Sequence, residues 1–359
     1  MMFMKGVILH GGRGTRLRPL THTGPKQLIP IANKPMSQYA LEDLIECGIR
    51  DIAVVLGDIA PEKVVKYYGD GSKFGVRLTY VRQGEPKGIA HAVGLVRDFV
   101  GHDPFVVYLG DNLLKDGIVG LVKEFESSMP DVQIALCKVP KPSFFGVAEV
   151  RDGRVVRLVE KPKDPPSDLA LVGVYMFRKS IFDAIDRLKP SWRGEFEITE
   201  AIQRIIDMGL AVHFRLVSGW WKDTGRPEDV LEANQLVLSD LNPCNKGRLE
   251  GEVATTGRIA IDQGTVVKSR CTLRGPLTIG RGCEIGPNTH LGPYTSIGDN
   301  VIIRGCEIEN SIVLSDTVIE CGRRITDSLV GKGSRITSND VGLPKGCRLI
   351  IGENTFVSM

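Results

Sequence analysis

A six-residue repeat in the last third of the chain restricts the fold more than any other sequence feature. Eight aliphatic residues stand six positions apart, beginning at Ile261 and Val267 and ending at Ile297 and Ile303. Four of them are followed by glycine, and small residues, Thr or Cys, recur two positions before many of them. Such a repeat predicts a parallel β-helix with one short strand per hexad, three strands per coil and glycine relieving the backbone at the corners. The register slips after Ile303, where we expect looser corners or insertions.

The chain before residue 242 has a different pattern, in which apolar runs alternate with helical periodicity. The runs 7–9, 52–56 and 105–109 are short and continuous, as in strands buried on both faces of a mostly parallel sheet. Helical patterns with one apolar face lie at 36–47, 118–125 and 198–206. We therefore expect an α/β fold, a Rossmann-like mostly parallel mixed sheet at 1–242, followed by a left-handed parallel β-helix at 243–359.

Composition excludes several classes of protein. The chain has 359 residues, 42% of them hydrophobic, and a net charge of +3, which argues against disorder and against a nucleic-acid binder. No apolar run reaches the roughly 18 residues that cross a membrane, and residues 1–6 lack a signal-peptide pattern. We expect a cytoplasmic protein. The eight cysteines form no CxxC pair, which disfavours a zinc site; most should be small buried residues, and an oxidised pair is left open.

A glycine-rich turn follows the first expected strand. Gly11, Gly12 and Gly14 allow backbone N–H groups to approach phosphate oxygens closely. The turn is neither a Walker A loop nor a dinucleotide fingerprint, because Arg13 and Arg16 crowd it and no GK[ST] follows. Arginines there can neutralise a polyphosphate through bidentate contacts. The alternative interpretation is a solvated basic loop.

Two acids and a lysine complete the candidate chemistry. Asp111 directly follows a buried strand, where a carboxylate faces the ligand crevice and suits Mg²⁺, although an Asp can also simply close a turn. Asp223 and Lys26 lie in the segments WWKDTG and GPKQL. Glu195 and Glu197 precede an expected helix, and one interpretation of these acids is simply that of charges at its N-terminus.

Nine motifs in order give the first domain a family resemblance. They read GGRGTRLRPLT, PKQLIPIANKP, QGEPKGIAHA, YLGDN, FGVAEV, VEKP, LVGVY, RGEFEIT and WWKDTG. Together they resemble the sugar-1-phosphate nucleotidyltransferases, and most of all the long form of the glucose-1-phosphate thymidylyltransferases, which also carries a hexapeptide-repeat tail. The resemblance implies dTTP and glucose 1-phosphate as substrates, Mg²⁺ as cofactor, no nucleic-acid or membrane partner, a homo-oligomer, and a product that normally feeds deoxysugar synthesis.

The resemblance also implies roles for individual residues. The catalytic residues would be Arg16, Lys26, Asp111, Lys161 and Asp223, with Asp111 and Asp223 as the metal ligands. The nucleotide would be bound by Gly11, Gly12, Gly14, Thr15, Arg16, Gln83 and Gly88. The sugar phosphate would be bound by Asn112, Gly146, Glu160, Lys161, Val172 and Arg193. His10 departs from the family, whose members usually have a small residue there, and it either packs against the turn or alters the fit of the nucleotide.

The chemistry can be argued without the family. A sugar phosphate is already anionic near neutral pH, because its second pKa is about 6. It needs no strong base, and the protein must instead hold two anions in line with arginine, lysine and a divalent ion. The motifs supply these groups and no Ser-His-Asp or Cys-His set.

Other functions remain open at this stage. A relative using UTP or GTP with another sugar 1-phosphate is the first alternative, since a methyl group on the base contributes only about 1–3 kcal/mol. A second is an acetyltransferase in the tail with His290 as base, although a surface histidine beside a repeat turn explains that residue as well. A third is a non-catalytic regulatory subunit. Such a subunit would lack a metal acid or the loop arginine, and both are present here.

Overall fold

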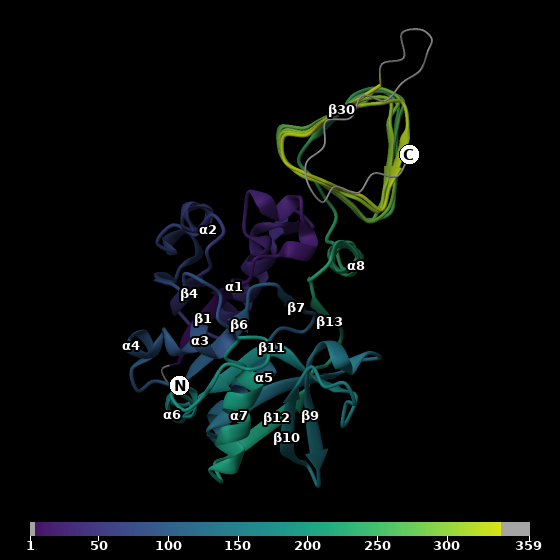
Figure 1. Ribbon diagram of the computed structural model, residues 1–359. Coiled ribbons are helices and arrows are strands. Elements are labelled where there is room, and N and C mark those ends of the chain that lie inside the picture. The colour runs from purple at the N-terminus through teal and green to yellow at the C-terminus, as the bar shows by residue number, and fades with distance from the viewer. Residues whose placement is uncertain (1–3, 339–359) are drawn as a thin grey trace. The chain divides into compact units, whose positions relative to one another are not determined.

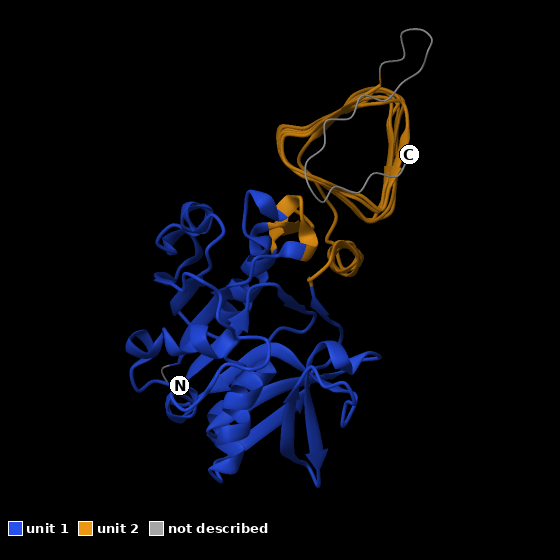
Figure 2. Cartoon of the chain, viewed as in Figure 1, with its two compact units in different colours: residues 1–15, 21–28, 36–223 blue, residues 16–20, 29–35, 224–359 orange. Residues whose placement is uncertain are grey.

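The computed structural model describes residues 4–338, and the chain divides into two compact units (Figure 2). Unit 1 comprises Met1–Thr15, Thr21–Leu28 and Met36–Asp223, and unit 2 comprises Arg16–Leu20, Ile29–Pro35 and Thr224–Met359. Two short N-terminal segments thus belong with the C-terminal unit. The domain limits 1–242 and 243–359 stay a prediction.

A nine-stranded mixed sheet forms the centre of unit 1 (Figure 1). Seven strands follow the order β10-β9-β11-β6-β1-β4-β5, β8 pairs with β11, and β12 pairs with β8. The strands β6, β1, β4 and β5 are mutually parallel, whereas β11 runs antiparallel to β6. The bounds are β1 Lys5–His10, β4 Asp51–Leu56, β5 Arg77–Arg82, β6 Phe105–Leu109, β8 Val132–Lys138, β9 Gly146–Arg151, β10 Arg154–Glu160, β11 Leu169–Phe177 and β12 Val212–Leu216.

Helices cover both faces of this sheet, as the alternating pattern predicted. Their bounds are α1 Met36–Glu46, α2 Pro61–Tyr68, α3 Ile89–Gly94, α4 Arg97–Val100, α5 Val119–Ser128, α6 Ser180–Ile185 and α7 Ile198–Asp207. Short 3₁₀ turns lie at Thr15–Leu17, Leu20–His22, Lys26–Leu28, Ser72–Phe74 and Pro142–Phe144. The predicted strands and the three predicted helices are confirmed, and α1 and α7 end just before glycines with positive φ, Gly48 and Gly209.

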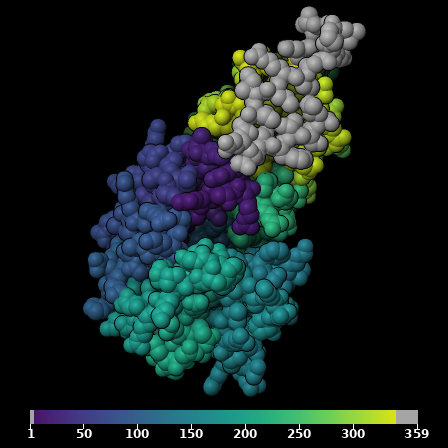
Figure 3. Space-filling model, viewed as in Figure 1, coloured from purple at the N-terminus to yellow at the C-terminus, as the bar shows by residue number. Residues whose placement is uncertain are grey.

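The strand β1 shows how the core is divided. Val7 and Leu9 join an apolar cluster with α3, α6 and α7, while Ile8 joins a second cluster with α1, α2 and α5. Successive side chains of a strand point to opposite faces, so β1 contributes to both clusters. In the space-filling view, side chains cover the face of this unit that is turned to the viewer (Figure 3). Because β1, β4 and β6 are parallel, the loops after His10, Leu56 and Leu109 lie at the same edge of the sheet.

Three parallel sheets form most of unit 2, and their triangular outline is visible in Figure 1. The first contains β14 Cys244–Asn245, β17 Ile259–Ile261, β20 Leu277–Ile279, β23 Thr295–Ile297, β26 Ile312–Val313 and β29 Leu329–Val330. The second contains β15 Arg248–Leu249, β18 Val266–Val267, β21 Glu284–Ile285, β24 Ile302–Ile303, β27 Val318–Glu320 and β30 Arg335–Thr337. The third, called the third face below, contains β16 Val253–Thr256, β19 Cys271–Arg274, β22 His290–Leu291, β25 Glu307–Glu309 and β28 Arg324–Thr326. This arrangement is consistent with the predicted β-helix, whose left-handedness stays a prediction.

The number of residues in each coil explains the six-residue repeat and its change of register after Ile303. Thr272 pairs with His290 in the next coil, eighteen residues later, as three hexads require. His290 then pairs with Glu307, and Ser296 with Ile312, so later coils have seventeen or sixteen residues. Each shortened coil keeps its inward aliphatic residue but loses residues at a corner, which is why the six-residue spacing fails after Ile303.

The role predicted for the repeat glycines is partly wrong. Among the four, only Gly286 has a positive φ, whereas the left-handed corner positions carry residues such as Asn288 and Asn300. A Cβ on Gly298 would lie 2.6 Å from the backbone nitrogen of Ser315 in the next coil. Glycine is needed at that position because successive coils approach closely, not because φ is positive.

The helix α8, Pro227–Ser239, packs on the first sheet of the coil within unit 2. Its fully buried Asn234 accepts hydrogen bonds from the Ala32 backbone N–H (2.9 Å) and the Ser296 hydroxyl (2.7 Å), and donates one to the Tyr294 carbonyl (2.9 Å). Ala32 lies between the short strands β2 Pro30–Ile31 and β3 Lys34–Pro35. These bonds explain why the segment 29–35 belongs with unit 2.

Two sequence expectations concern the whole chain. Within residues 4–338 no helix combines the length and apolarity needed to cross a membrane. The seven cysteines of that range are all free thiols, and four of them are buried. Cys347 lies outside the described residues.

Candidate active site

The glycine-rich turn after β1 is fixed from several directions. The Gln27 amide donates to the Gly11 carbonyl (2.8 Å), and the Thr21 hydroxyl donates to the Gly14 carbonyl (2.7 Å). Gly12 and Gly14 have φ of +90° and +58°, conformations that a side chain would strain. The turn therefore has one defined shape and needs glycine to adopt it.

A pocket of about 310 Å³ opens beside this turn, entirely within unit 1. It is lined by Leu9, Gly11, Gly12, Arg13, Lys26, Gln83, Pro86, Gly88, Ile89, Ala92, Leu109, Asp111 and Glu195. Six of these were predicted as site residues from the sequence. The apolar residues of the lining were not, because nothing in their local pattern separates them from the core. A glycine-rich turn, a lysine and a carboxylate against an apolar wall can accept a base and its phosphates.

Gln83 and Gly88 lie together in this wall. The Gln83 amide is 3.2 Å from the Gly88 carbonyl and 3.4 Å from Nδ1 of His91. Gly88 has φ of +99°, and a Cβ there would lie 2.5 Å from the carbonyl oxygen of Phe196. This close approach brings the segment 195–196 to the pocket and explains why Glu195 lines it.

Lys26 and Asp111 form a short ion pair at the floor of the pocket. Burial acts most strongly on the Asp111 carboxyl and would raise its pKa. The charge and hydrogen bond of Lys26, helped by the Asn112 amide, outweigh burial and leave the pKa of Asp111 below its ordinary value. The carboxyl is thus an anion at neutral pH, as a cation ligand must be.

A small two-stranded sheet brings the second acid to the first. Strand β7, Asn112–Leu114, pairs antiparallel with β13, Trp221–Asp223, and the register places Asp223 opposite Asn112. Burial raises the pKa of Tyr175, and the charges of Glu160, Asp111 and Asp223 act in the same direction. The two acids are separated by over one hundred residues in sequence and are neighbours in the fold.

Asn112 holds this arrangement together. Its amide donates to Asp111 (3.1 Å), and its oxygen accepts from the Gly173 backbone (3.2 Å) and the Trp221 indole (2.7 Å). The residue is 2% exposed. Its visible role is to orient Asp111, and direct contact with a sugar stays a prediction.

The predicted sugar-phosphate residues form a second cluster. The register of β9 and β10 places Gly146 opposite Glu160. A Cβ on Gly146 would lie 2.6 Å from the Thr199 side chain and 3.1 Å from a Glu160 oxygen, so glycine leaves the carboxyl its room. Glu160 contacts Lys161 (3.6 Å) and Arg193 (3.4 Å).

Arg193 is bound by more carboxylates than the sequence suggested. It also contacts Glu195 (2.9 Å) and Glu197 (3.3 Å). Burial raises the pKa of Glu197, which nevertheless bonds the Ser191 hydroxyl. Because Glu195 also lines the nucleotide-sized pocket, this cluster and the pocket share a wall.

The remaining predicted residues are placed differently. The Val172 side chain is fully buried in the same apolar cluster as Ile8, so only its backbone could meet a sugar. Gly14 and Thr15 do not line the pocket. Arg16 belongs to unit 2, where a Cβ added to Gly225 would lie 3.0 Å from its guanidinium, and its catalytic role stays a prediction.

His10 packs beneath the turn instead of facing the pocket. It is 2% exposed, its ring meets Tyr68 edge-on at 6.1 Å, and neither ring nitrogen has a hydrogen-bond partner among residues 4–338. Burial lowers the pKa of His10 to about 3, against a smaller opposite effect of Asp111. The imidazole is therefore neutral.

Two family models match parts of the chain. The family model described as nucleotidyl transferase matches residues 5–240, and a model described as the GMPPB C-terminal domain matches residues 273–354. The chain belongs to the nucleotidyl transferase family.

Individual relatives narrow the comparison. The chain is 52% identical over 353 residues to the low-salt glycan biosynthesis nucleotidyltransferase Agl11 of Haloferax volcanii, covering 98% of this chain and 99% of the relative. It is 46% identical over 359 residues to a glucose-1-phosphate thymidylyltransferase of Streptomyces antibioticus, with 99% of each covered. A solved structure of a putative glucose-1-phosphate thymidylyltransferase from Bacillus anthracis, in complex with a sucrose, matches with a TM-score of 0.63 and 40% identity, covering 67% of this chain and 98% of that one.

Proposed function

We propose that the protein transfers a thymidylyl group from dTTP to α-D-glucose 1-phosphate and releases pyrophosphate and dTDP-glucose. The observation that carries this proposal is the β7–β13 pairing, which gathers Asp111 and Asp223 beside Lys26 and the glycine-rich turn. The name of the Streptomyces relative supports the choice of nucleotide and sugar.

The donor set suits Mg²⁺. Two carboxylates offer only oxygen atoms, and within residues 4–338 no cluster of three or more His, Cys, Asp or Glu residues forms a cage for another metal. Mg²⁺ typically takes one or two carboxylates and fills its other positions with water and substrate phosphates. Asp111 and Asp223 would hold the ion, which when bound would neutralise charge on the phosphates.

The protein's own residues then have separate tasks. The glycine-rich turn would hold the phosphates through its backbone, and Lys26 would add a positive charge beside them. Glu160 would bind sugar hydroxyls, and Lys161 would hold the sugar phosphate in line with the α-phosphorus. The sugar phosphate is already deprotonated, so no residue needs to remove a proton from the nucleophile.

Arg193 fits a positioning role better than direct binding. Its three carboxylate partners keep it in place, and it in turn fixes Glu160 and Glu195 at the wall between the two clusters. A sugar phosphate would have to displace at least one of these partners to reach it.

A matrix of substrates tests the proposal. The purified protein would be given dTTP, UTP, GTP or dCTP, each with glucose, galactose, mannose or N-acetylglucosamine 1-phosphate, and pyrophosphate release would be measured with and without Mg²⁺. We expect dTTP with glucose 1-phosphate to give the highest kcat/KM, with some use of UTP. A clear preference for another pair would identify the alternative nucleotidyltransferase, and no release with any pair would reject both.

A further inference from the structure

A pocket of about 240 Å³ lies on the third face of unit 2, along one corner of the coil. It is lined by Arg270, Thr272, Asn288, Thr289, His290, Gly305, Cys306, Glu307, Gly322, Arg323 and Arg324. The pairing of Thr272 with His290, of His290 with Glu307 and of Glu307 with Arg324 shows that four successive coils contribute. Nothing in the proposed reaction uses this pocket.

The pocket is open because two of the four coils have glycine at this corner. At equivalent positions the four coils carry Arg270, Asn288, Gly305 and Gly322, all with φ between 53° and 61°. Asn288 shows that this corner accepts a side chain. A Cβ on Gly305 would have nothing within 4 Å, so glycine there leaves open space that an asparagine would fill.

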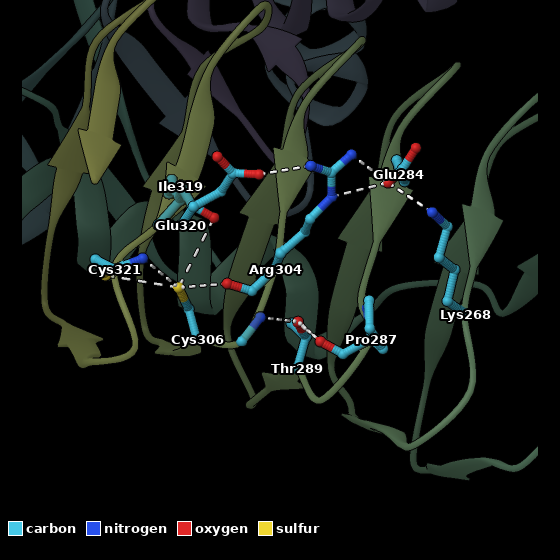
Figure 4. Close-up of polar contacts among 10 residues, drawn as sticks. Lys268, Glu284, Pro287, Thr289, Arg304, Cys306, Ile319, Glu320 and Cys321 are labelled. Atoms are coloured by element: carbon cyan, nitrogen blue, oxygen red, sulfur yellow. Dashed lines mark hydrogen bonds and ion pairs between the residues drawn. The ribbon is translucent and has the colours of Figure 1, made fainter. Parts of the chain in front are cut away.

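An irregularity in the fourth coil places Arg323 at this pocket. At the position before the third-face strand, the preceding coils bury Cys271, Thr289 and Cys306, whereas the fourth coil has the exposed Arg323. Cys321 fills the interior instead. Its backbone N–H donates to the Cys306 sulfur (3.2 Å), and the two sulfurs are 3.5 Å apart (Figure 4). The fourth coil thus buries Cys321, two positions before Arg323, and leaves Arg323 outside the coil.

The cations on the adjacent face, formed by the second sheet, are paired with carboxylates. There Glu284 binds Lys268 (2.7 Å) and Arg304 (2.7 Å), and Arg304 continues to Glu320 (2.7 Å), forming a ladder across four coils (Figure 4). In contrast, no carboxylate of residues 4–338 lies within 4.0 Å of the guanidinium of Arg270 or Arg323. These arginines keep their hydrogen-bond donors available.

Acidic residues at the pocket only partly balance its charge. Glu307 lines it, and Glu309 pairs with Arg324 and lies 3.7 Å from Nε2 of His290. Three arginines therefore face two carboxylates, with His290 between them. The backbones of Arg270 and Arg323 lie on coils three steps apart, about 14 Å at the usual strand spacing, and both residues line the pocket between them. A small ligand that uses both must lie between these two long side chains and carry more than one anionic group.

We propose that this corner pocket binds the diphosphate group of a small molecule, held by Arg270 and Arg323 with His290 beside it. Each guanidinium can grip one phosphoryl group through paired N–H donors. The volume suits free pyrophosphate or the diphosphate portion of a larger molecule, whose remaining part would lie outside. The site belongs to unit 2 and is separate from the pocket of unit 1.

Histidine NMR of the full chain tests the proposal, because His290 lines this pocket and His91 lies at the wall of the other. The six histidines would be isotopically labelled, and the His290 signal assigned with His290→Asn. Inorganic pyrophosphate and, separately, dTDP would be added in metal-free buffer at low salt, with sulfate at equal ionic strength as control. We expect pyrophosphate to move the His290 signal saturably, and sulfate to move it much less. A shift with dTDP as well would show that the diphosphate group suffices, and a shift with pyrophosphate alone would restrict the ligand to the free ion.

Two variants and a control localise the binding. Arg323→Gln should weaken it about tenfold or more, as expected for a lost charge-assisted bond. Gly305→Asn should abolish it by filling the hollow, with the fold retained. Arg274→Gln changes an exposed arginine of the same face outside the pocket and should have no effect. No movement of the His290 signal at millimolar pyrophosphate would overturn the proposal, as would equal weakening by Arg323→Gln and Arg274→Gln. The His91 signal reports the unit 1 pocket separately, so the failure of one site does not decide the other.

Discussion

Burial of His10 makes a quantitative prediction about stability and pH. Its pKa is about 3 in the folded protein, against an ordinary value of 6.5, because burial removes the ring from water. Between these values the unfolded chain takes up a proton that the folded chain refuses, so stability must fall as the pH drops below 6.5. Going from about pH 8 to about pH 5 should remove about 2 kcal/mol through this one residue. This loss of stability depends mainly on the pKa of His10 in the unfolded chain. It changes little provided that the pKa of His10 in the folded protein stays below about 4.

The assay can be confined to the unit that holds His10. All three tryptophans, Trp192, Trp220 and Trp221, belong to unit 1, so their fluorescence during urea unfolding reports that unit. The His10→Ala variant should lose about 2 kcal/mol less than the wild type between the two pH values. The cavity left by this substitution lowers the free energy of unfolding equally at both pH values, so its effect cancels in the comparison.

An exposed histidine provides the control. The variant His102→Asn should keep the wild-type pH dependence, because this side chain is exposed in the fold. If His10→Ala also kept the wild-type dependence, the ring would have to be protonated or hydrated in the folded state. The account of a dry, neutral imidazole beneath the glycine-rich turn would then be refuted.

Further predictions concern the two acids, the sugar-phosphate lysine and the coil. Asp111→Asn or Asp223→Asn should lower kcat by about two to three orders of magnitude, the scale for removing an electrostatic stabiliser; near-normal turnover in both would remove the metal assignment. Lys161→Ala should mainly raise the KM for glucose 1-phosphate, and unchanged kinetics for that substrate would show that the lysine does not hold it. Gly298→Ala should destabilise unit 2 by about 1–3 kcal/mol through its clash with the next coil, measured by thermal unfolding, whereas equal stability of the variant and wild type would mean that the coils can separate locally without penalty.

Most of the fold could be predicted because its signals are periodic. The buried parallel strands appear as continuous apolar runs, and the coil appears as aliphatic residues six apart. The β-helix was expected from residue 243, but the repeat itself is recognisable only from Ile261, because the strand residues of the first coil are largely exposed and polar, with Arg248 and Thr255 at paired positions. Periodicity of apolar residues cannot reveal a coil whose strands carry few apolar residues.

Part of the candidate site could be predicted, namely the single residues that stand in recognisable motifs. Lys26 and Asp111 were singled out from their motifs, Gln83 and Gly88 were implied only by the family resemblance, and all four line the pocket. Partnerships between distant residues were not predictable, since they depend on tertiary register. Nothing in the sequence shows that Asn112 bonds Gly173 and Trp221 or that Arg193 meets Glu160.

A crystal structure with dTTP and Mg²⁺ tests the central claim most directly. We predict the metal ion between the carboxyls of Asp111 and Asp223, the phosphates on the glycine-rich turn with Lys26 beside them, and the base against Gln83. A nucleotide bound elsewhere, with these two acids facing only solvent, would contradict the claim that they assemble the reacting phosphates.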